Sequence, residues 1–298
     1  DRDQSEIDYF KSLDPLNLLL KSEFWSKKRE KIKQEIDNYI QDVLKIKMEK
    51  EEYCFDQLPR KKDYSLIEVK NEKTRMVQAL NRAYSESLSD GSFFIGEDIV
   101  DPYGGAFKVT KGFSSNYPNQ VLTSSISEAG MVGVSIGMAL MGTQSYTEIM
   151  FGDFATLAFD QLLNNASKMH HMYNFQVDVP LRIRTPMGGK RGYGPTHSQS
   201  LEKFFVGIDN VLTIAMSSLH NPVSSIRELN NIQCPAFIVE NKLDYGKILW
   251  QGNDLYKLYK QDKPFGGLIL SPNDYDPEIT LVSYGETARH IADNLNYL

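Results

Sequence analysis

Apolar residues recur at helical spacing in the first part of the chain. From Lys21 to Glu52, lysines and glutamates surround a face that carries Ile32, Ile36, Tyr39, Ile40, Val43 and Leu44. This pattern predicts one amphipathic helix with a solvated charged face, and its apolar face needs a partner surface. Asp14-Pro15 predicts the start of a shorter helix over residues 16–21, and Pro59 with the basic residues after it indicates a linker.

From Thr74 onwards, helical patterns alternate with short apolar runs. The runs are rich in β-branched and aromatic residues and predict strands at residues 93–96, 121–124, 145–150, 179–185, 211–216 and 236–240. The segments between them predict helices over residues 74–88, 154–173 and 223–230, and one that begins near Glu128. This alternation predicts an α/β fold with a doubly wound, mostly parallel sheet that binds ligands at the carboxyl ends of its strands.

The last part of the chain shows the same alternation once more. Residues 279–283 are expected to form a strand and residues 286–298 a helix. Because one strand and one helix cannot form a core, they indicate the start of a second α/β domain. We therefore divide the chain into a helical extension with its linker (1–66), the sheet domain (67–250), a linker (251–275) and the start of a second domain (276–298).

Charge and cysteine content narrow the class of protein. The 298 residues include 33 basic and 39 acidic side chains, so the formal net charge of −6 argues against a general nucleic-acid partner. No apolar run is long enough to span a membrane or to act as a signal peptide. Cys54 and Cys234 are too few and too far apart for a disulfide framework or a Cys-x-x-Cys metal motif. We expect a soluble protein of the cytoplasm or another reducing compartment.

Glu128 stands at the start of an uncharged segment over residues 129–142 that predicts a buried helix. Gly130, Gly133 and Gly137 share one face of this helix. Each glycine costs up to about 1 kcal/mol in a helix interior, so the face is expected to approach another backbone closely. Ser125 and Glu128 have the spacing of a capping box, in which the glutamate only caps the helix. Alternatively, Glu128 is a carboxyl group for proton chemistry, because burial raises a carboxyl pKa more than a helix N-terminus lowers it.

The loop over residues 186–199 is the second unusual segment. Its glycines and prolines follow a strand, but their spacing fits neither a dinucleotide-binding turn nor a phosphate-binding loop. His197 is either a surface or capping residue or a functional one, and Lys190 and Arg191 are either solvated or hold a carboxylate or phosphate. Glu97 follows the first strand of the sheet and either caps the next turn or belongs to the same site.

Several ordered segments together resemble a known family. They are Phe94-Ile95-Gly96-Glu97-Asp98, residues 103–112, residues 125–130, residues 148–154, Phe159-Asp160-Gln161, Thr196-His197-Ser198-Gln199 and Val239-Glu240-Asn241. From about residue 72 to 246, the chain resembles the beta subunit of the thiamine-dependent decarboxylase of 2-oxo acid dehydrogenase complexes. Residues 1–58 look like the tail of the alpha subunit, and residues 279–298 look like the start of the transketolase-like C-terminal domain of the beta subunit.

This resemblance implies a thiamine diphosphate pyrimidine-binding fold and specific roles for site residues. Glu128 matches a glutamate that hydrogen-bonds the aminopyrimidine ring of the cofactor and promotes loss of the proton from its thiazolium carbon. Phe154 matches an aromatic residue that packs on the pyrimidine, and Ile126 lines the same pocket. Glu97 matches a glutamate implicated in proton communication between two sites, and His197 a histidine that assists substrate handling or acyl transfer.

The resemblance also implies a reaction and partners. The reaction is oxidative decarboxylation of a 2-oxo acid, pyruvate or a branched-chain type, with acyl transfer to lipoamide. An alpha-type subunit, or an alpha portion upstream, holds the diphosphate and Mg²⁺ through a Gly-Asp-Gly to Asn motif. That motif is absent here, because Gly152-Asp153-Phe154 and Asn164-Asn165 lack its spacing and third residue. The implied assembly is an α2β2-type oligomer that serves a lipoyl acyltransferase component, in the cytoplasm or the mitochondrial matrix.

Two other functions remain open at this point. A transketolase-like ketol transferase shares the pyrimidine-binding fold and its glutamate, although the alpha-like tail ahead of the beta-like region argues against it. A non-catalytic scaffold would retain the fold without binding the cofactor, although the presence of Glu128, Phe154 and His197 argues against that function.

Overall fold

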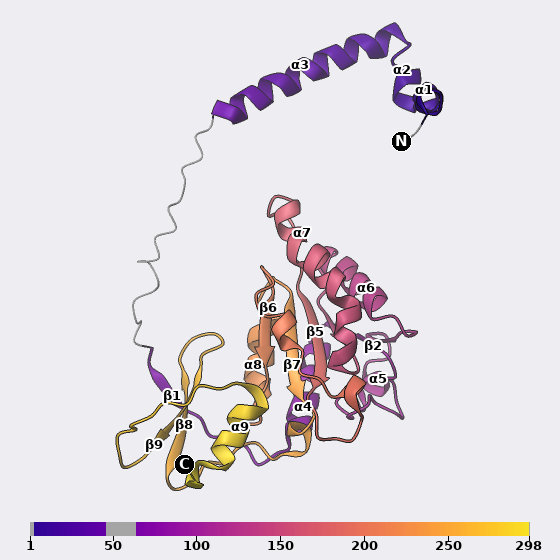
Figure 1. Ribbon diagram of the computed structural model, residues 1–298. Coiled ribbons are helices and arrows are strands. Elements are labelled where there is room, and N and C mark those ends of the chain that lie inside the picture. Colours follow the sequence, from indigo (N-terminus) through magenta and orange to yellow (C-terminus); the bar gives the residue numbers. More distant parts are fainter. Residues whose placement is uncertain (1–2, 46–63, 298) are drawn as a thin grey trace. The chain divides into compact units, whose positions relative to one another are not determined.

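The computed structural model describes residues 3–45 and 64–297 (Figure 1). The chain forms two compact units, residues 1–62 and residues 63–298. Each unit has its own architecture and is considered by itself. None of the helices among the described residues is long and apolar enough to cross a membrane.

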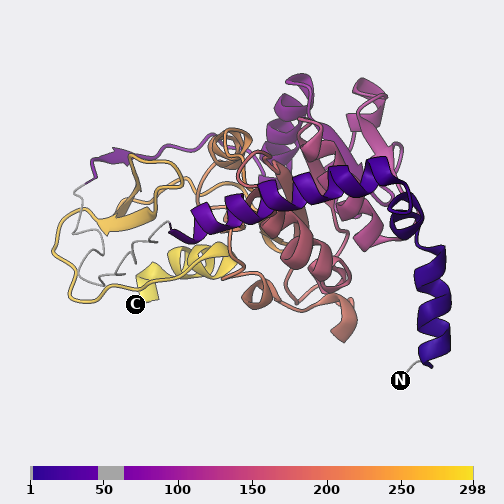
Figure 2. The ribbon, with the colours of Figure 1, turned by 90° about the horizontal axis from the view of Figure 1, so that it is seen from above.

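The first unit consists of three helices: α1 (Gln4–Leu13), α2 (Pro15–Leu19) and α3 (Glu23–Lys45). The Asp14 carboxylate accepts the backbone N–H of Leu16 at 2.8 Å, and Pro15 occupies the first turn of α2, so the predicted start is confirmed. The amphipathic helix is confirmed as far as Lys45 and runs without a break in Figure 2. The rest of that predicted helix and the linker at Pro59 lie outside the described residues.

The three helices bury none of their own side chains within the described part of the unit. Apolar side chains of α2 and α3 instead line an open groove, namely Leu16, Leu19, Leu20, Trp25, Ile32 and Ile36. Lys28, Arg29 and Lys33 border this groove. The apolar face therefore has the character of a surface that another structure covers.

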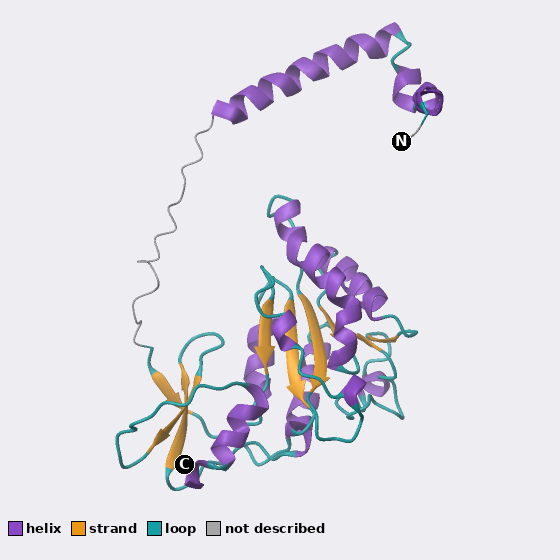
Figure 3. Cartoon of the chain, viewed as in Figure 1, coloured by secondary structure: helices purple, strands orange, loops and turns teal. Residues whose placement is uncertain are grey.

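The second unit is built on a parallel sheet, as the sequence predicted (Figure 3). Its six strands, in spatial order, are β3 (Val121–Thr123), β2 (Phe93–Gly96), β4 (Ser145–Glu148), β5 (Leu181–Met187), β7 (Ala236–Asn241) and β6 (Leu212–Ala215). All five neighbouring pairs are parallel. The chain reverses its direction across the sheet after β3, when β4 pairs on the other side of β2, which makes a crevice at the carboxyl edge there.

Two apolar clusters show that helices cover both faces of this sheet. On one face α4 (Met76–Ser89) and α8 (Pro222–Asn230) pack together, and the short α5 (Phe113–Asn116) joins the same cluster. On the other face lie α6 (Glu128–Leu140), the 3₁₀ helix η2 (Gly152–Ala158), the π-helical turn η3 (Gln161–Ala166) and α7 (Ser167–Met172). The prediction of a single α-helix over residues 154–173 is therefore wrong. The segment is helical, but its hydrogen-bond geometry changes from 3₁₀ to π to α along the chain.

A small antiparallel sheet consists of β1 (Leu66–Glu68), β8 (Tyr256–Gln261) and β9 (Leu268–Pro272). In the chain, β1 precedes the parallel sheet, and β8 and β9 follow it. Both β8 and β9 lie in the segment 251–275, for which the sequence predicted a linker. The helix predicted over residues 286–298 is confirmed as α9 (Gly285–Asp293), although it ends at Asp293, before the predicted end. Its Ala292 joins a cluster with Trp250 and Leu258. Short 3₁₀ turns complete the fold: η4 (Pro195–His197), η5 (Glu202–Phe204), η6 (Asp244–Gly246) and η7 (Leu295–Tyr297).

The strand predicted at residues 279–283 is wrong. Ile279 and Val282 are 77% and 93% exposed, and no described strand pairs with this segment. A β-branched, apolar run forms a strand only where a neighbouring strand satisfies its backbone groups. The described part of the chain offers no such neighbour here.

Candidate functional site

The residues singled out from the sequence lie at the carboxyl edge of the parallel sheet. Glu97 follows β2, Glu128 begins the helix after β3, Phe154 lies in η2 after β4, and His197 lies in the loop after β5. Because these strands are parallel, their carboxyl ends meet at one edge. The fold thus gathers the segments that carry these residues where α/β proteins bind ligands.

The capping box predicted for Ser125 and Glu128 is wrong. Ser127 is the N-cap of α6, since its hydroxyl accepts the backbone N–H of Gly130 at 3.3 Å. Glu128 is consequently the first residue of the helix rather than the third. Ser125 and Ser127 were both possible N-caps from the sequence, and in the structure Ser127 is the N-cap. The carboxylate of Glu128 receives no hydrogen bond from any residue the structure describes.

Glu97 and Glu128 form a pair of buried carboxyl groups. Glu97 is 8% exposed and Glu128 is 5% exposed. The Glu97 carboxylate accepts the backbone N–H of Ser127, the residue before Glu128, at 3.2 Å. Burial and then the charge of Glu128 raise the pKa of Glu97, although the Ser127 hydrogen bond opposes them. Glu97 therefore retains a proton to a higher pH than an isolated surface glutamate would.

The glycine face of α6 makes no close backbone contact within the described chain. A methyl group built on Gly137 would meet nothing within 4 Å, and one on Gly133 would meet only the Gln161 side-chain oxygen, at 3.9 Å. Val134 and Met141 on the same helix are 56% and 83% exposed. The close approach expected from the glycines is absent here, and contact of this face with another chain stays a prediction.

His197 and Phe154 lie side by side. Their ring centroids are 5.1 Å apart in an edge-to-face arrangement, and the ring of Phe151 lies 4.8 Å from the same histidine. His197 is half-buried, and its Nδ1 hydrogen-bonds the Thr196 hydroxyl at 2.9 Å. An imidazole held between aromatic edges has a fixed orientation and one ring nitrogen available for chemistry.

The loop that carries His197 is tied down by buried groups. The Lys242 amine donates a hydrogen bond to the backbone oxygen of His197. The Gln199 side-chain amide donates to Oδ1 of the buried Asp153 at 2.7 Å. The other oxygen of Asp153 is buried without a hydrogen-bond partner among the described residues. The shape of this loop is thus set by contacts that reach into the core.

Other residues considered from the sequence are placed less distinctively. Ile126 is 85% exposed, so it lines no pocket formed by the described chain alone. Lys190 and Arg191 are exposed, and the guanidinium of Arg191 lies 5.8 Å from the centre of the Phe107 ring. Within residues 3–45 and 64–297, no three acidic, histidine or cysteine side chains are grouped as metal ligands would be.

A buried ionic cluster beneath the site was missed by sequence reasoning. Arg184 donates hydrogen bonds to Glu148 and, at 2.9 Å from Nε, to Glu240. The hydroxyls of Tyr84 and Tyr245 donate to Glu240 at 2.6 and 2.7 Å. Four of these residues lie in elements that looked like ordinary apolar strands or helices. The charged residues Arg184, Glu148 and Glu240 within otherwise apolar strands were the sequence feature that could have predicted this cluster.

The two glutamates of this cluster titrate differently. Burial raises the pKa of Glu148, which the charge of Arg184 opposes. Burial also acts on Glu240, but the charge of Arg184 and hydrogen bonds from Arg184 and the tyrosines outweigh it and lower its pKa. One cation facing two carboxylates leaves one excess negative charge in the core. As the pH falls, Glu148 is therefore the first of the two carboxyl groups to bind a proton.

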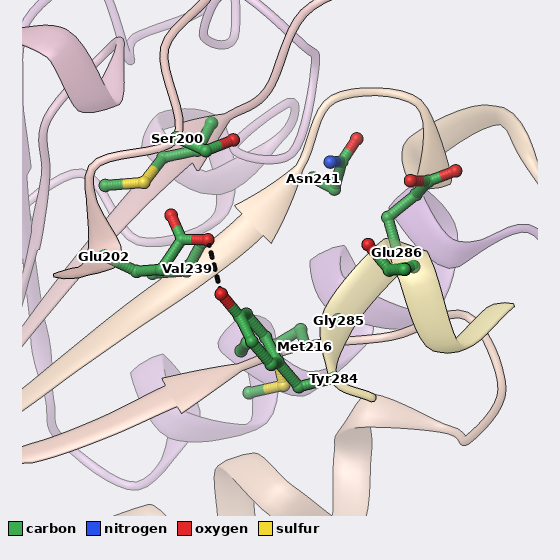
Figure 4. A pocket seen from close by; sticks show the side chains of 11 residues that line it. Ser200, Glu202, Met216, Val239, Asn241, Tyr284, Gly285 and Glu286 are labelled. Carbon is green, nitrogen blue, oxygen red and sulfur yellow. Dashed lines mark hydrogen bonds between the residues drawn. The ribbon is translucent and has the colours of Figure 1, made fainter. Parts of the chain in front are cut away.

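A cavity of about 80 Å³ lies elsewhere on the carboxyl edge, between β5, β6, β7 and the first residues of α9 (Figure 4). The Tyr284 hydroxyl donates to Glu202 at 3.0 Å across it. None of the predicted site residues lines this cavity. On this measure about 10–15 Å³ is enough to hold one water molecule, so the cavity has room for several waters.

Comparison with known proteins gives a consistent result. The family described as "Transketolase, pyrimidine binding domain" matches residues 72–247. The chain is 32% identical over 172 residues to the "Pyruvate dehydrogenase E1 component subunit beta-1, mitochondrial" of Oryza sativa subsp. japonica. The aligned region covers 57% of this chain and 46% of that protein. The chain is 36% identical over 220 residues to a "Pyruvate dehydrogenase E1 component subunit beta" of Staurastrum punctulatum, covering 72% of this chain and 64% of that one.

These relatives confirm the resemblance to beta subunits that the sequence motifs indicated. The chain spans about half the length of the first of these curated relatives. Among solved structures, a "Split gene transketolase, inactive beta4 tetramer" matches with a TM-score of 0.44 and 18% identity, over 58% of this chain and 52% of that one.

Proposed function

The chain belongs to the family of transketolase pyrimidine-binding domains, and from this premise we propose that it supplies the pyrimidine-binding half of a thiamine-diphosphate-dependent site. The proposed reaction is decarboxylation of a 2-oxo acid, followed by acyl transfer to lipoamide. The observation that carries the proposal is the buried pair of Glu97 and Glu128 at the carboxyl edge of the sheet. The names of the beta-subunit relatives support the reaction class.

The residues present fit the pyrimidine end of the cofactor. Glu128 is buried, carries no hydrogen bond from the described chain, and is free to bond a ring nitrogen. Phe154 offers an aromatic face beside it in the fold, since η2 packs on α6. When bound, thiamine diphosphate supplies an electron sink for loss of the carboxyl group. We propose that Ile126, exposed on this chain alone, lines the pocket once a partner closes it.

The protein side chains would handle protons and orientation. Glu128 would hold a hydrogen bond to the pyrimidine, and Glu97, whose pKa is raised, would accept or return a proton next to it. His197 would orient the 2-oxo acid or the acyl acceptor, because its ring is fixed by Phe151 and Phe154. Pyruvate and branched-chain 2-oxo acids are the proposed substrates.

The other half of the site is proposed to come from an alpha-type subunit or portion. That partner would hold the diphosphate and Mg²⁺, for which the described residues offer no cluster of ligands. The open glycine face of α6 and the apolar groove of the first unit are surfaces that an α2β2-type assembly could cover. A lipoyl acyltransferase component would then receive the acyl group.

The test is the variant Glu128→Gln in an assembly reconstituted with an alpha-type chain of the same source. We expect release of carbon dioxide from pyruvate or 3-methyl-2-oxobutanoate to fall roughly 100-fold or more, because a neutral amide cannot relay a proton. The control is Glu202→Gln, which changes a carboxyl group at the separate cavity and should leave the rate unchanged. Unchanged decarboxylation by Glu128→Gln would contradict the proposal.

Two further measurements separate the alternative functions. Transfer of a two-carbon ketol unit from a sugar phosphate, without decarboxylation of 2-oxo acids, would identify a ketol transferase. Failure of the wild-type assembly to bind thiamine diphosphate with Mg²⁺ in calorimetry would identify a scaffold. Either result would replace the proposed function.

A further inference from the structure

Lys242 is the most deeply buried charged side chain next to the candidate site. Its side chain is fully inaccessible, and it follows β7 directly in the chain. The amine donates to the backbone oxygen of His197 and forms no ion pair in the described part of the chain. Its nitrogen lies 5.0 Å from the centre of the Phe151 ring and 5.7 Å from that of Tyr193.

The surroundings of Lys242 make an ammonium group costly. Removing an ammonium from water is unfavourable unless charged and hydrogen-bonding partners replace the solvent. Here the partners are one carbonyl oxygen and two aromatic faces, and burial accordingly lowers the pKa of Lys242, an effect that the charge of Asp153 opposes. A methionine would fill the same space without this cost. The amine therefore has a role that packing does not explain.

The backbone fixes where this amine points. The N–H of Lys242 donates to the Met187 oxygen at 3.0 Å, which extends the pairing of β7 with β5. A second anchor holds the same loop two residues further on, where Gln199 bonds the buried Asp153. The Gly188 N–H donates to the Gln199 oxygen at 3.1 Å and closes the base of the loop. Gln199 is thus held by other groups, and His197 is the residue of the loop whose backbone the Lys242 amine contacts.

We propose that Lys242 is a positioning residue, whose buried amine fixes the backbone of His197 and so aims its imidazole past Phe151 and Phe154 into the site. The contact itself is a property of this chain alone. Its importance for turnover rests on the proposed function, in which His197 handles the substrate or the acyl acceptor. The two parts are therefore tested separately.

The first test follows His197 directly by nuclear magnetic resonance of the full chain labelled with ¹⁵N-histidine. The chain has five histidines, and His197→Gln assigns the signal of interest. In Lys242→Met we expect the His197 ring signals to shift and broaden while the other four stay in place. Lys203→Met, which removes an exposed positive charge from the turn η5, should move none of them.

A second variant keeps this test decisive. Lys242→Gln retains a polar group but is too short to reach the His197 oxygen, so the same change is expected if Lys242→Met does not fold. Thermal unfolding of each variant shows that the fold is retained. A His197 spectrum that matches the wild type in a folded variant would overturn the proposal.

The second test measures turnover in the reconstituted assembly. Lys242→Met should lower kcat for the 2-oxo acid about tenfold or more with a smaller change in KM, because His197 is present but misdirected. If Glu128→Gln retains full activity, the proposed function fails while the spectroscopic result stands. If Glu128→Gln is inactive and Lys242→Met has wild-type kcat, the positioning role in turnover is refuted.

Discussion

The backbone N–H of Ser127 and the carboxylate of Glu97 are joined by a hydrogen bond of 3.2 Å. This bond connects the end of β2 to the N-cap of α6, because Ser127 is at once the cap of the helix and the neighbour of Glu128. It holds two buried carboxyl groups at the same helix start. The geometry of the cap and the protonation of the pair are consequently coupled.

Glu97→Gln should stabilise the chain at neutral pH. Burial and the charge of Glu128 raise the pKa of Glu97 above the ordinary value of 4.5, so the folded state favours the neutral form. Glutamine is neutral and still accepts the Ser127 N–H. Wild-type stability is lost as pH rises from 4.5 through the raised pKa, and the variant avoids that loss. Thermal unfolding between pH 4 and pH 8 should show a difference that opens over this window and then stays constant.

The exposed Glu278 provides the control for this measurement. Glu278→Gln should follow the wild-type melting temperature at every pH, because no buried partner surrounds it. A difference between Glu97→Gln and wild type that is the same at pH 4 and pH 8 would show that the carboxyl pair does not bear the cost assigned to it.

Substitutions in the buried ionic cluster should follow a fixed order. Arg184→Met leaves the two buried carboxyl groups without their cation and should cost about 3–5 kcal/mol in the free energy of unfolding. Glu240→Gln weakens bonds from Arg184 and both tyrosines and should cost less. Glu148→Gln should cost least, because the pKa of Glu148 is raised, whereas that of Glu240 is lowered. Urea unfolding at pH 7 measures all three, and a larger loss in Glu148→Gln than in Glu240→Gln would contradict the opposite directions of the two pKa shifts.

Arg182 pairs with no acidic side chain among the described residues. Its guanidinium donates to the backbone oxygens of Leu229, Ile232, Cys234 and Leu181, and burial lowers its pKa to about 10. The carbonyls of Leu229 and Ile232 lie at and just beyond the negative end of the α8 dipole, which favours a cation. Arg182→Met leaves several buried carbonyls unsatisfied and should cost roughly 3 kcal/mol or more in unfolding free energy.

Arg227 on the surface of α8 is the matched control for Arg182. It pairs with Glu86 at 2.9 Å, and its side chain is 67% exposed. Arg227→Met should change the unfolding free energy by less than about 1 kcal/mol, because water screens the pair. Equal losses for the two arginine variants in urea titrations would refute the importance of the carbonyl contacts.

The parallel sheet could be predicted from the sequence because its strands are short apolar runs separated by helical patterns. The position of Glu128 at a carboxyl edge followed from the same pattern. The cap at Ser127 could not be chosen from sequence, since Ser125 and Ser127 both fit a helix start and only the φ and ψ angles decide. The sequence did not indicate that Lys242 belongs to the site, because its contact with His197 joins positions 45 apart that only the fold brings together.

Prediction from the sequence missed the strands β8 and β9 of the small sheet, and it predicted a strand at residues 279–283 that does not form. The strand β8 carries Lys257 and Lys260, and Gly266 and Gly267 lie between β8 and β9, a composition typical of a linker. The pairing of β8 with β1 joins segments at opposite ends of the unit's sequence. Residues 279–283 have the composition of a strand but no described neighbour to pair with. A segment forms a strand only when it pairs with a neighbouring strand, and the sequence of the segment alone does not show whether that neighbour exists.

The glycine face of α6 leads to the last prediction, which separates folding from assembly. A methyl group on Gly137 would meet nothing within 4 Å, so Gly137→Ala should raise the unfolding free energy of the isolated chain by roughly 0.5–1 kcal/mol through helix propensity. A methyl group on Gly130 would lie 2.6 Å from the Ser127 hydroxyl, so Gly130→Ala displaces the cap and should gain nothing.

Gly137→Trp extends the same comparison to the assembly. In the isolated chain the Cβ atom of the new side chain meets nothing within 4 Å, so Gly137→Trp should fold, with a smaller gain in unfolding free energy than Gly137→Ala because tryptophan has a lower helix propensity than alanine. If another chain packs on this face, the indole blocks the approach, and light scattering after gel filtration with the alpha-type chain should show loss of the α2β2 mass. Leu122→Trp, at an exposed position on β3, is the control for an added indole. Full assembly of Gly137→Trp would place the interface elsewhere and leave the glycines without an intermolecular role.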